Sequence, residues 1–490
     1  MLVPMSMETY FIQIGVALHI IGIAGLVLFG CHRLWLLICW PMAKDDPPGD
    51  PSLLGDPPRV TVQLPLFNES RVAARLIDAA ANIAWPASRV EIQVLDDSTD
   101  ETRGIVDERA VFWRSRGRAI RVVRRTSRQG YKAGALANGL RTAQGEFIAV
   151  FDADFIPRPD FLEKTITRFS DPDVGLVQTR WSFLNTDYSW LTRLQALLLS
   201  PHFSIEHKVR NRRRLFFNFN GTAGVWRKKA IETAGGWHSD TVTEDLDLSY
   251  RAQLFGWRFV YLDSVAVPSE LPITLAGFRG QQERWSRGSI QTARKILPVL
   301  LTSRLPVSVK IEAAAHLLAN FCWLFGFIAT LTLFPLIVFR VGIGPWQILT
   351  VDVPVFLLSG GAFLVYYFCY VIFSGQKGQA LILPILPALS IGLAPALSLS
   401  VVKGLFSRGG YFNRTPKLGM MGKSIPEKIV IRESVTGPLP LLINLILLVY
   451  SLAPLGWAIE RQTWGALPLL LLFPLGFLLS IGKDLQELRK

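Results

Sequence analysis

The sequence predicts a mostly parallel α/β domain inserted between membrane-spanning helices. The 490 residues are 50% hydrophobic, and the mean hydropathy of +0.32 is too high for an ordinary soluble enzyme. Long apolar runs lie before residue 58 and after residue 307, and several are long enough to cross ~30 Å of hydrocarbon. Between them, runs rich in β-branched residues alternate with amphipathic runs, which is the pattern of a parallel sheet covered by helices.

The first apolar run, Phe11–Trp40, predicts a retained membrane anchor. It lacks a preceding basic region and a small-residue cleavage site, so we do not expect its removal as a signal peptide. Arg33, Lys44 and Arg59 follow the apolar residues, whereas no Lys or Arg precedes them. The excess of positive charge predicts that the amino terminus lies outside and the following domain in the cytoplasm.

The α/β region shows four strand-like runs at residues 59–67, 91–98, 120–126 and 145–155, with helical runs at 69–85 and 99–115 between the first three. Parallel sheets bind their ligands beyond the carboxyl ends of the strands. Asp96-Asp97 and Asp152-Ala153-Asp154 fall at two such ends. We therefore expect these carboxylates to converge on one crevice.

The carboxyl-terminal half contains further apolar runs at about 313–339, 353–373, 381–402, 439–459 and 466–481. Residues 381–402 carry Pro384, Pro387 and Pro395, so we interpret them as re-entrant or interfacial, or as two short tilted spans. Either arrangement returns the basic loop that follows, residues 403–436, to the cytoplasm. The predicted division is an anchor and linker (1–58), a cytoplasmic domain (59–270), interfacial helices (271–306), membrane helices with the re-entrant segment (307–402), the basic loop (403–436) and final membrane helices (437–490).

The net charge of +14 does not indicate a nucleic-acid partner, because no zinc-finger spacing or RNA-binding aromatic motif accompanies it. The densest basic cluster, at residues 208–214, predicts contact with anionic lipid headgroups, and a solvated helix end is the alternative. The four cysteines all fall in or beside apolar segments, which fits a reducing cytoplasm without disulfides or a cysteine metal site.

Asp152 and Asp154 leave a buried strand together and form an oxygen-rich pair suited to Mg²⁺ or Mn²⁺. Such a cation would neutralise a diphosphate leaving group, and an Asp-rich surface turn is the alternative. Asp97 is placed to accept hydrogen bonds from a nucleotide base or ribose, although Asp97, Ser98 or Thr99 could instead cap the following helix. Lys132 opens a helix after a glycine turn, where phosphate contact is favoured over a solvated lysine.

Two later motifs complete a candidate catalytic set. Thr243-Glu244-Asp245 begins a helix, where these residues could simply cap it and complement its dipole. An inverting transferase, however, needs one carboxylate to remove the acceptor proton. In Gln281-Gln282-Glu283-Arg284-Trp285, Arg284 would face phosphates, Trp285 would offer a plate to a sugar ring and Gln281 could bind the acceptor. The alternative is an interfacial helix with its Trp at headgroup depth.

With these motifs in this order, and with QLPLFNES, QVLDDSTDET and FNGTAGVWRKKAIETAGGW around them, residues 59–300 resemble family 2 glycosyltransferases of the cellulose-synthase and cellulose-synthase-like type. The resemblance implies a GT-A-like domain, Asp245 as base with Glu244 beside the substrate, and Asn220, Gly221 and Thr222 near the acceptor end. Residues 411–417 are similar to the gating loop FxVTxK, which would bring Phe412, Thr415 and Lys417 to the donor; Arg414 stands where that pattern has valine.

The resemblance implies an inverting, metal-dependent transfer of hexose from a nucleotide sugar to a β-linked polysaccharide, which passes through the membrane helices. UDP-glucose is the preferred donor and GDP-mannose the second. Accessory export subunits, membrane lipids as neighbours and a bacterial inner membrane are further expectations. A single transfer to a membrane lipid, and a non-catalytic export component, remain the alternatives.

Overall fold

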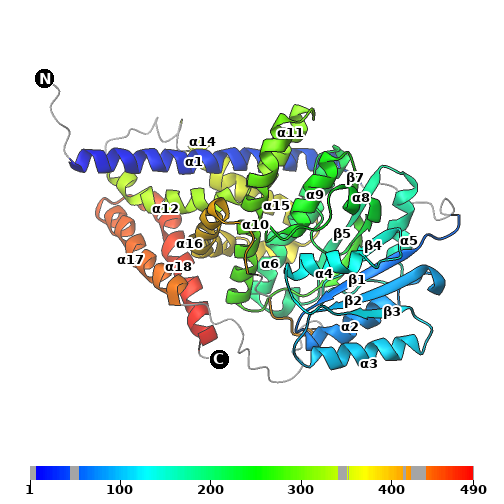
Figure 1. The fold of residues 1–490 in the computed structure, drawn as a ribbon. Helices are drawn as coiled ribbons and strands as arrows, with labels where there is room; N and C mark the ends of the chain where they lie inside the picture. The colour runs from blue at the N-terminus through cyan, green and yellow to red at the C-terminus, as the bar shows by residue number, and fades with distance from the viewer. Residues whose placement is uncertain are drawn as a thin grey trace.

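The computed structural model describes residues 7–44, 55–339, 350, 353–411, 415–420 and 438–488. It has two regions, a sheet-containing domain and a set of long apolar helices (Figure 1). Helix α1 (Met7–Cys39) runs along one side of the apolar helices and leads into the sheet domain, as the blue ribbon in Figure 1 shows. The predicted α/β domain between membrane-length helices is confirmed.

The domain is built on a seven-stranded sheet with the order β3-β2-β1-β4-β6-β5-β7. Its strands are β1 (Val60–Leu66), β2 (Val90–Asp96), β3 (Ile120–Val123), β4 (Phe147–Val150), β5 (Val174–Phe183), β6 (Gly224–Arg227) and β7 (Arg258–Ser269). Only β6 runs antiparallel to its neighbours β4 and β5, so the predicted mostly parallel sheet is confirmed. The four predicted strands correspond to β1–β4, but β4 stops at Val150, so the two aspartates lie beyond it.

Two apolar cores cover the two faces of this sheet. One packs under α2 (Ser70–Ala81), α3 (Thr102–Arg114) and α5 (Phe161–Ile166); the other lies under α4 (Tyr131–Leu140), α8 (Lys228–Thr233) and α9 (Glu244–Leu254). β1 is buried at six of its seven residues, as expected for a strand covered on both faces. The carboxyl ends of the central strands are thereby held at one edge.

The chain then continues through α6 (Trp190–Pro201), the π-helical turn η6 (His202–His207) and α7 (Lys208–Arg212), which lie between β5 and β6 in sequence. Arg210 belonged to the cluster predicted to contact lipid headgroups, and this prediction is wrong for it. Its guanidinium is fully buried and pairs with Glu206 and Glu312. Arg212, Arg213 and Arg214 are exposed.

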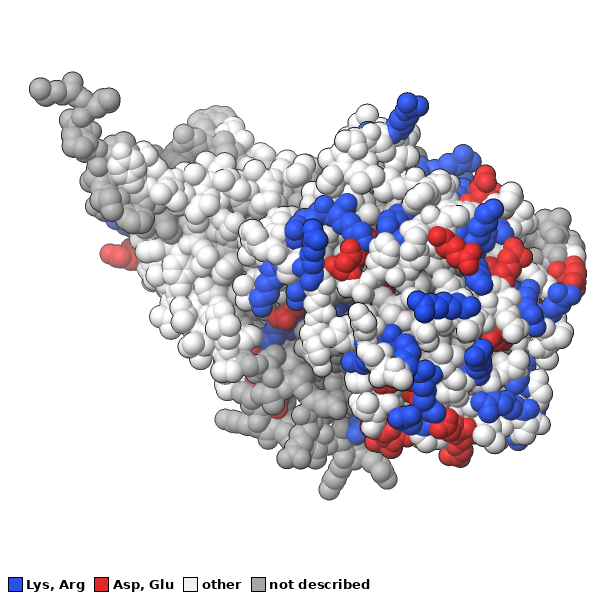
Figure 2. All heavy atoms as spheres, viewed as in Figure 1, with Lys and Arg blue, Asp and Glu red and all other residues white. Residues whose placement is uncertain are grey.

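The remaining helices are α10 (Leu275–Thr302), α11 (Val307–Leu318), α12 (Phe321–Phe339), α14 (Val353–Phe356), α15 (Ala362–Phe373), α16 (Ile385–Phe406), α17 (Pro438–Glu460) and α18 (Leu467–Leu488). Within the described residues, five helical segments are long and apolar enough to cross a membrane: 13–42, 353–373, 385–406, 438–460 and 464–487. Figure 2 shows Lys, Arg, Asp and Glu gathered over the sheet domain, whereas the visible surface of the helical region is almost uncharged. That distribution is typical of a membrane protein.

Two details differ from the predicted membrane region. Residues 385–406 form one helix, α16, with Pro395 inside it, so the alternative of two short tilted spans is wrong, whereas the re-entrant or interfacial placement stays a prediction. Pro384 precedes it and Pro387 lies in its first turn, where a missing N–H removes no helical hydrogen bond. The bend falls elsewhere, between α11 and α12, which meet at 59° and count as a sixth span only if taken together.

Both ends of α16 nevertheless contact elements next to the sheet domain. Leu386 belongs to the same apolar cluster as Leu36 of α1 and Leu275 of α10, and Ser407, directly after α16, bonds to Arg287 and Gln291 of α10. Helix α16 therefore lies along α10, and its position in a bilayer stays a prediction.

Candidate active site

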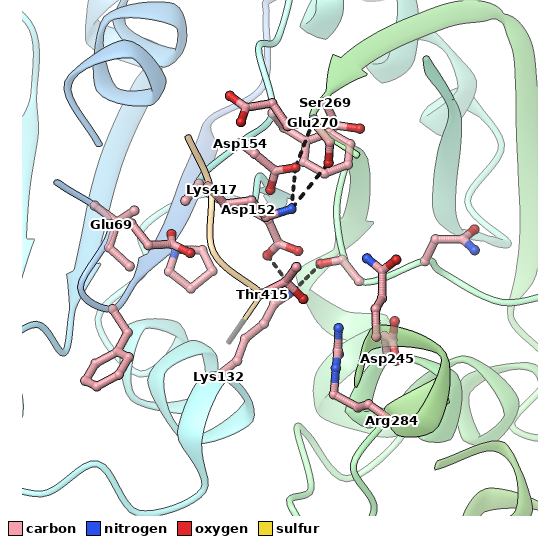
Figure 3. Close-up of a pocket in the computed structure, with 18 of the residues that line it drawn as sticks. Glu69, Lys132, Asp152, Asp154, Asp245, Ser269, Glu270, Arg284, Thr415 and Lys417 are labelled. Atoms are coloured by element: carbon pink, nitrogen blue, oxygen red, sulfur yellow. Dashed lines mark hydrogen bonds and ion pairs between the residues drawn. The ribbon is translucent and has the colours of Figure 1, made fainter. Parts of the chain in front are cut away.

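A cleft opens at the carboxyl ends of β1, β2 and β4 and is closed on its other side by α9 and α10. About 1130 Å³ of empty space, part of it open to solvent, lies within it. Nearly all predicted site residues line it together, although they come from segments up to 320 positions apart: Asp97, Lys132, Asp152, Asp154, Asn220, Gly221, Glu244, Asp245, Gln281, Arg284, Trp285, Thr415 and Lys417. Figure 3 shows how several of them point into the cleft.

Asp97 follows β2 and is held by a forked ion pair with Arg125, whose Nε lies 3.0 Å from Asp97 Oδ1 and whose Nη2 bonds to Oδ2. The capping alternative is wrong, because α3 begins only at Thr102, whose N–H donates to Asp100 Oδ1 over 3.0 Å. Arg125 thus orients a carboxylate at the cleft wall. The contact of Asp97 with a nucleotide base or ribose stays a prediction.

Asp152 and Asp154 follow β4, and each meets one lysine. Lys132 Nζ lies 2.6 Å from Asp152 Oδ1 and donates to the Gly221 carbonyl over 2.8 Å. Lys417 Nζ lies 2.8 Å from Asp154 Oδ2. Burial opposes the charge on both lysines, but the facing carboxylates outweigh it and raise the pKa of each. The aspartate pair therefore binds two ammonium groups, that of Lys132 at Asp152 and that of Lys417 at Asp154.

These two carboxylates fit a divalent cation by their chemistry. Among the contacts of the described residues, each uses one oxygen for a lysine, so that Asp152 Oδ2 and Asp154 Oδ1 are not taken by those ion pairs. Hard cations prefer such oxygens, and Mg²⁺ commonly takes one or two carboxylates together with substrate phosphates. Asp152 and Asp154 would hold the ion, which would neutralise charge on a diphosphate.

A second acidic group, His238, Asp240 and Asp247, brings three ligand atoms within 4.8 Å of one another. The ammonium of Lys295 already lies 2.9 Å from an oxygen of each of the two aspartates. Arg251 also bonds to Asp247 at 2.8 Å. These contacts place the group in an ion-pair network at the start of α9.

Asp245 is the second residue of α9, and Glu244 precedes it at the cleft wall. Burial, followed by the charge of Glu244, raises the pKa of Asp245 to about 7, in the range suited to a general base. Thr243 is at the N-cap position but does not cap the helix with its side chain, whereas Glu244 and Asp245 do lie in the first turn, where acids complement the helix dipole. Gly221, with φ +82°, approaches closely: an added Cβ there would lie 2.8 Å from Asp245 Oδ2.

A pH profile tests this assignment. A base with a pKa of about 7 must be ionised to act, so kcat/KM is expected to fall as pH drops through about 7. Glu244→Gln removes the neighbouring negative charge, which lowers the pKa of Asp245 and moves this acid limb to lower pH. The pH dependence of initial rates for wild type and variant checks this, and an unmoved limb contradicts the electrostatic coupling.

Gln281, Arg284 and Trp285 line the cleft from α10. Gln281 Oε1 is buried without a hydrogen-bond partner among the described residues, and so is Arg128 Nε across the cleft. Buried polar atoms are normally paired, so these two atoms are available to a ligand in the cleft. α10 itself is anchored by α18: Glu487 accepts from the Leu275 and Ala276 N–H groups at 2.6 and 3.1 Å, and Asp484 pairs with the buried Arg279.

Within the predicted acceptor segment, Asn220 and Gly221 line the cleft but Thr222 does not. Thr222 is fully buried, and its Oγ1 accepts the Asp152 N–H over 2.8 Å. The prediction of substrate contact by Thr222 is therefore wrong, because the side chain supports the backbone of the aspartate pair instead. Thr415 and Lys417 reach the cleft as predicted, whereas Phe412 lies outside the described residues.

Sequence reasoning missed Glu270, which lies at the end of β7 in the cleft wall. Its carboxylate pairs with Arg75 at 2.5 Å and accepts the N–H groups of Leu418 and Gly419 at 3.1 and 3.2 Å. Glu270 thereby holds residues 415–420 at the cleft, where Figure 3 shows Thr415 and Lys417 on a segment of coil. A lone acid after a strand carried no local signal for this.

Residues 57–288 match the family described as Glycosyltransferase like family 2. They form a family 2 glycosyltransferase domain with a GT-A-like, mostly parallel sheet. The resemblance to the cellulose-synthase-like branch is confirmed by curated relatives. Glucomannan 4-beta-mannosyltransferase 2 of Arabidopsis thaliana is 46% identical over 268 residues, 53% of this chain and 50% of the relative.

Glucomannan 4-beta-mannosyltransferase 1 of Oryza sativa subsp. japonica is 43% identical over 288 residues, 58% of this chain and 54% of the relative. The chain thus spans about half the length of the curated relatives it matches. Among solved structures, the mannosyltransferase PcManGT from Pyrobaculum calidifontis, in complex with GDP-Man and Mn²⁺, superposes with a TM-score of 0.55. That likeness covers 81% of this chain and 99% of PcManGT at 21% identity, and it shows the fold.

Proposed function

We propose that this chain is an inverting hexosyltransferase that extends a β-linked polysaccharide of the mannan or glucomannan type from a nucleotide sugar. The observation that carries the proposal is the position of Asp245. Its carboxylate has a pKa of about 7 and lies in one cleft with the aspartate pair and with Arg284 and Trp285. Such a transfer needs a base for the acceptor proton, a site for a divalent cation and a positively charged side chain beside the leaving diphosphate.

In the proposed step, an acceptor hydroxyl gives its proton to Asp245 while its oxygen attacks the anomeric carbon of the donor. The bond from that carbon to the diphosphate breaks on the opposite face, and the diphosphate leaves with the bonding electron pair. One displacement inverts the configuration, so an α-linked donor yields a β linkage. Arg284 and Lys132 supply positive charge on the leaving-group side, and Trp285 offers its ring to the acceptor sugar.

The donor is best tested as GDP-mannose before UDP-glucose. The curated relatives are named mannosyltransferases, which favours mannose over the glucose preferred from the sequence. The structure of PcManGT was solved with GDP-Man and Mn²⁺, which makes Mn²⁺ the first cation to supply. Incubation of the full chain with each labelled donor, with and without chelator, measures both requirements.

Product length decides between a polymer and a single transfer. Wild type is expected to convert the preferred donor into a ladder or high-molecular-weight product that an endo-β-mannanase or endo-β-glucanase digests. Trp285→Ala is expected to shorten this product, because it removes the ring face that would hold the acceptor sugar, a contact worth roughly 0.5–1.5 kcal/mol in aromatic pairs. A product that stops at one hexose and extracts into organic solvent contradicts the polymer proposal and identifies a glycolipid synthase.

We also propose that the cleft faces the cytoplasm in a multi-pass membrane protein, as the positive charges after α1 predict. Arg408, two residues after α16, is exposed, so Arg408→Cys in a cysteine-free background is a suitable probe. A membrane-impermeant maleimide is expected to label it only in inside-out vesicles. Labelling in right-side-out vesicles contradicts this orientation. Accessory export subunits remain part of the proposal.

A further inference from the structure

Two histidines hold the side-chain amide of Asn220 between them. His207 Nε2 lies 2.6 Å from Asn220 Oδ1, and Asn220 Nδ2 lies 3.0 Å from His202 Nε2. Both histidines come from the π-helical turn η6, whereas Asn220 lines the cleft next to Gly221. None of the motifs in the sequence contains either histidine.

The hydrogen-bond pattern assigns a direction to each contact. His202 Nδ1 lies 3.1 Å from Glu206 Oε2, and a carboxylate only accepts, so His202 carries a proton on Nδ1. In the neutral ring, its Nε2 then accepts from the Asn220 amide nitrogen. The Asn220 oxygen faces His207, which must donate from Nε2. His207 Nδ1 is accordingly a buried atom without a hydrogen-bond partner among the described residues.

Neighbouring side chains hold His207 in place and determine its charge state. His207 is fully buried and packs against the rings of Phe203, Phe217 and Tyr261. Burial, with the nearby His202 and Arg210, holds the pKa of His207 well below its usual range, so its ring stays neutral. Glu206 also accepts from Arg210 at 3.2 Å, which ties the turn to α7.

The oriented amide has one N–H and one carbonyl lone pair left for a ligand in the cleft. A sugar hydroxyl both donates and accepts, so it matches this pair. The site lies beside the base, because an added Cβ on the adjacent Gly221 would come within 2.8 Å of Asp245 Oδ2. A hydroxyl held by Asn220 would therefore belong to the sugar whose neighbouring oxygen reacts.

We propose that His202 and His207 are positioning residues that fix the Asn220 amide so that it binds a hydroxyl of the acceptor's terminal sugar. The inference rests on the proposed function, and it assigns acceptor recognition to a turn outside the family's motifs. A randomly oriented amide would offer the wrong atom in half of the molecules and would lose order. Acceptor affinity should therefore depend on the histidines, whereas donor affinity should not.

The experiment measures binding of a β-1,4-linked mannohexaose to the purified full chain, and separately the kinetics with GDP-mannose. His207→Phe keeps the ring among its aromatic neighbours but removes the donor. His207→Gln removes the ring but returns a donor near the position of Nε2. His207→Phe is expected to weaken mannohexaose binding and raise the acceptor KM about tenfold, the size of one lost hydrogen bond, while the donor KM and donor hydrolysis without acceptor stay unchanged.

His207→Gln is expected to recover most of the affinity, which a purely structural role of the ring would not allow. His202→Phe should reproduce the loss and serves if His207→Phe does not fold, with thermal melting as the check. Four outcomes overturn the inference. In the first two, both Phe variants bind with wild-type affinity, or His207→Phe and His207→Gln lose the same affinity. In the other two, the variants lose donor hydrolysis to a matching extent, or wild type fails to bind the oligosaccharide. Binding that follows the expected order without any transfer overturns the proposed function alone.

Discussion

Asp245→Asn is expected to lower the rate of transfer by ~10²–10⁴-fold, the usual contribution of a general base. The amide keeps the size of the side chain but cannot take the acceptor proton. Its position explains why binding should survive: among the described residues, Asp245 Oδ1 accepts from the N–H of Leu246 at 2.8 Å, and an amide oxygen can replace that contact. Donor affinity is therefore expected to stay within a few-fold of wild type.

Isothermal titration with the nucleotide sugar and initial rates on the same preparation measure the two quantities. Asp187→Asn is a matched control, since Asp187 pairs with Arg193 on the surface and lies outside the cleft. It is expected to behave as wild type in both measurements. A large loss of donor affinity in Asp245→Asn, with the control intact, would reassign Asp245 to the nucleotide site.

Asp154→Asn is expected to remove almost all activity, because a neutral amide is a poorer ligand for a hard cation than a carboxylate. A cation that neutralises the leaving diphosphate is worth several kcal/mol, and each 1.36 kcal/mol is tenfold in rate, so the loss should be on the order of 10² or more. Excess chelator should remove the activity of wild type to a similar extent.

The fold should survive this change. Asp154 Oδ2 accepts the Glu270 N–H at 3.1 Å, and an asparagine oxygen can do the same. What the variant loses is the charge that faces Lys417. Asp160→Asn is the control, since Asp160 pairs with Lys164 near the surface. Undiminished turnover in Asp154→Asn, or in chelated wild type, would show that the reaction needs no cation at the aspartate pair.

The sequence alone was sufficient for features that depend on neighbours along the chain. The length of an apolar run determines whether a helix can cross a membrane, and alternation of strand-like and helical runs determines a parallel sheet. Because parallel strands end at one edge, Asp97 and Asp152 could be placed in a common crevice before any contact was known. Asp245 and Arg284 needed the order of motifs as well, because a helix start and an amphipathic helix have simpler explanations.

Only the tertiary structure decided which groups face these residues. Lys417 reaches Asp154 across 263 positions, Arg75 reaches Glu270 across 195, and Asp484 reaches Arg279 across 205. An ion pair of this kind leaves no trace in local composition, because either partner alone looks like a solvated charge. Thr222 and Arg210 were misjudged for the same reason: a polar residue is exposed or buried according to partners from distant segments.

The histidines beside Asn220 are the clearest case. His202 and His207 lie in a helical stretch whose apolar residues predict only packing, and they belong to none of the motifs identified in the sequence. The proposed role follows from the contact between η6 and the turn before β6, where the half-buried Asn220 amide lies between two ring nitrogens. Sequence thus determined the elements and the carboxylates at their ends, whereas three-dimensional packing determined the protonation, pairing and orientation of the side chains between them.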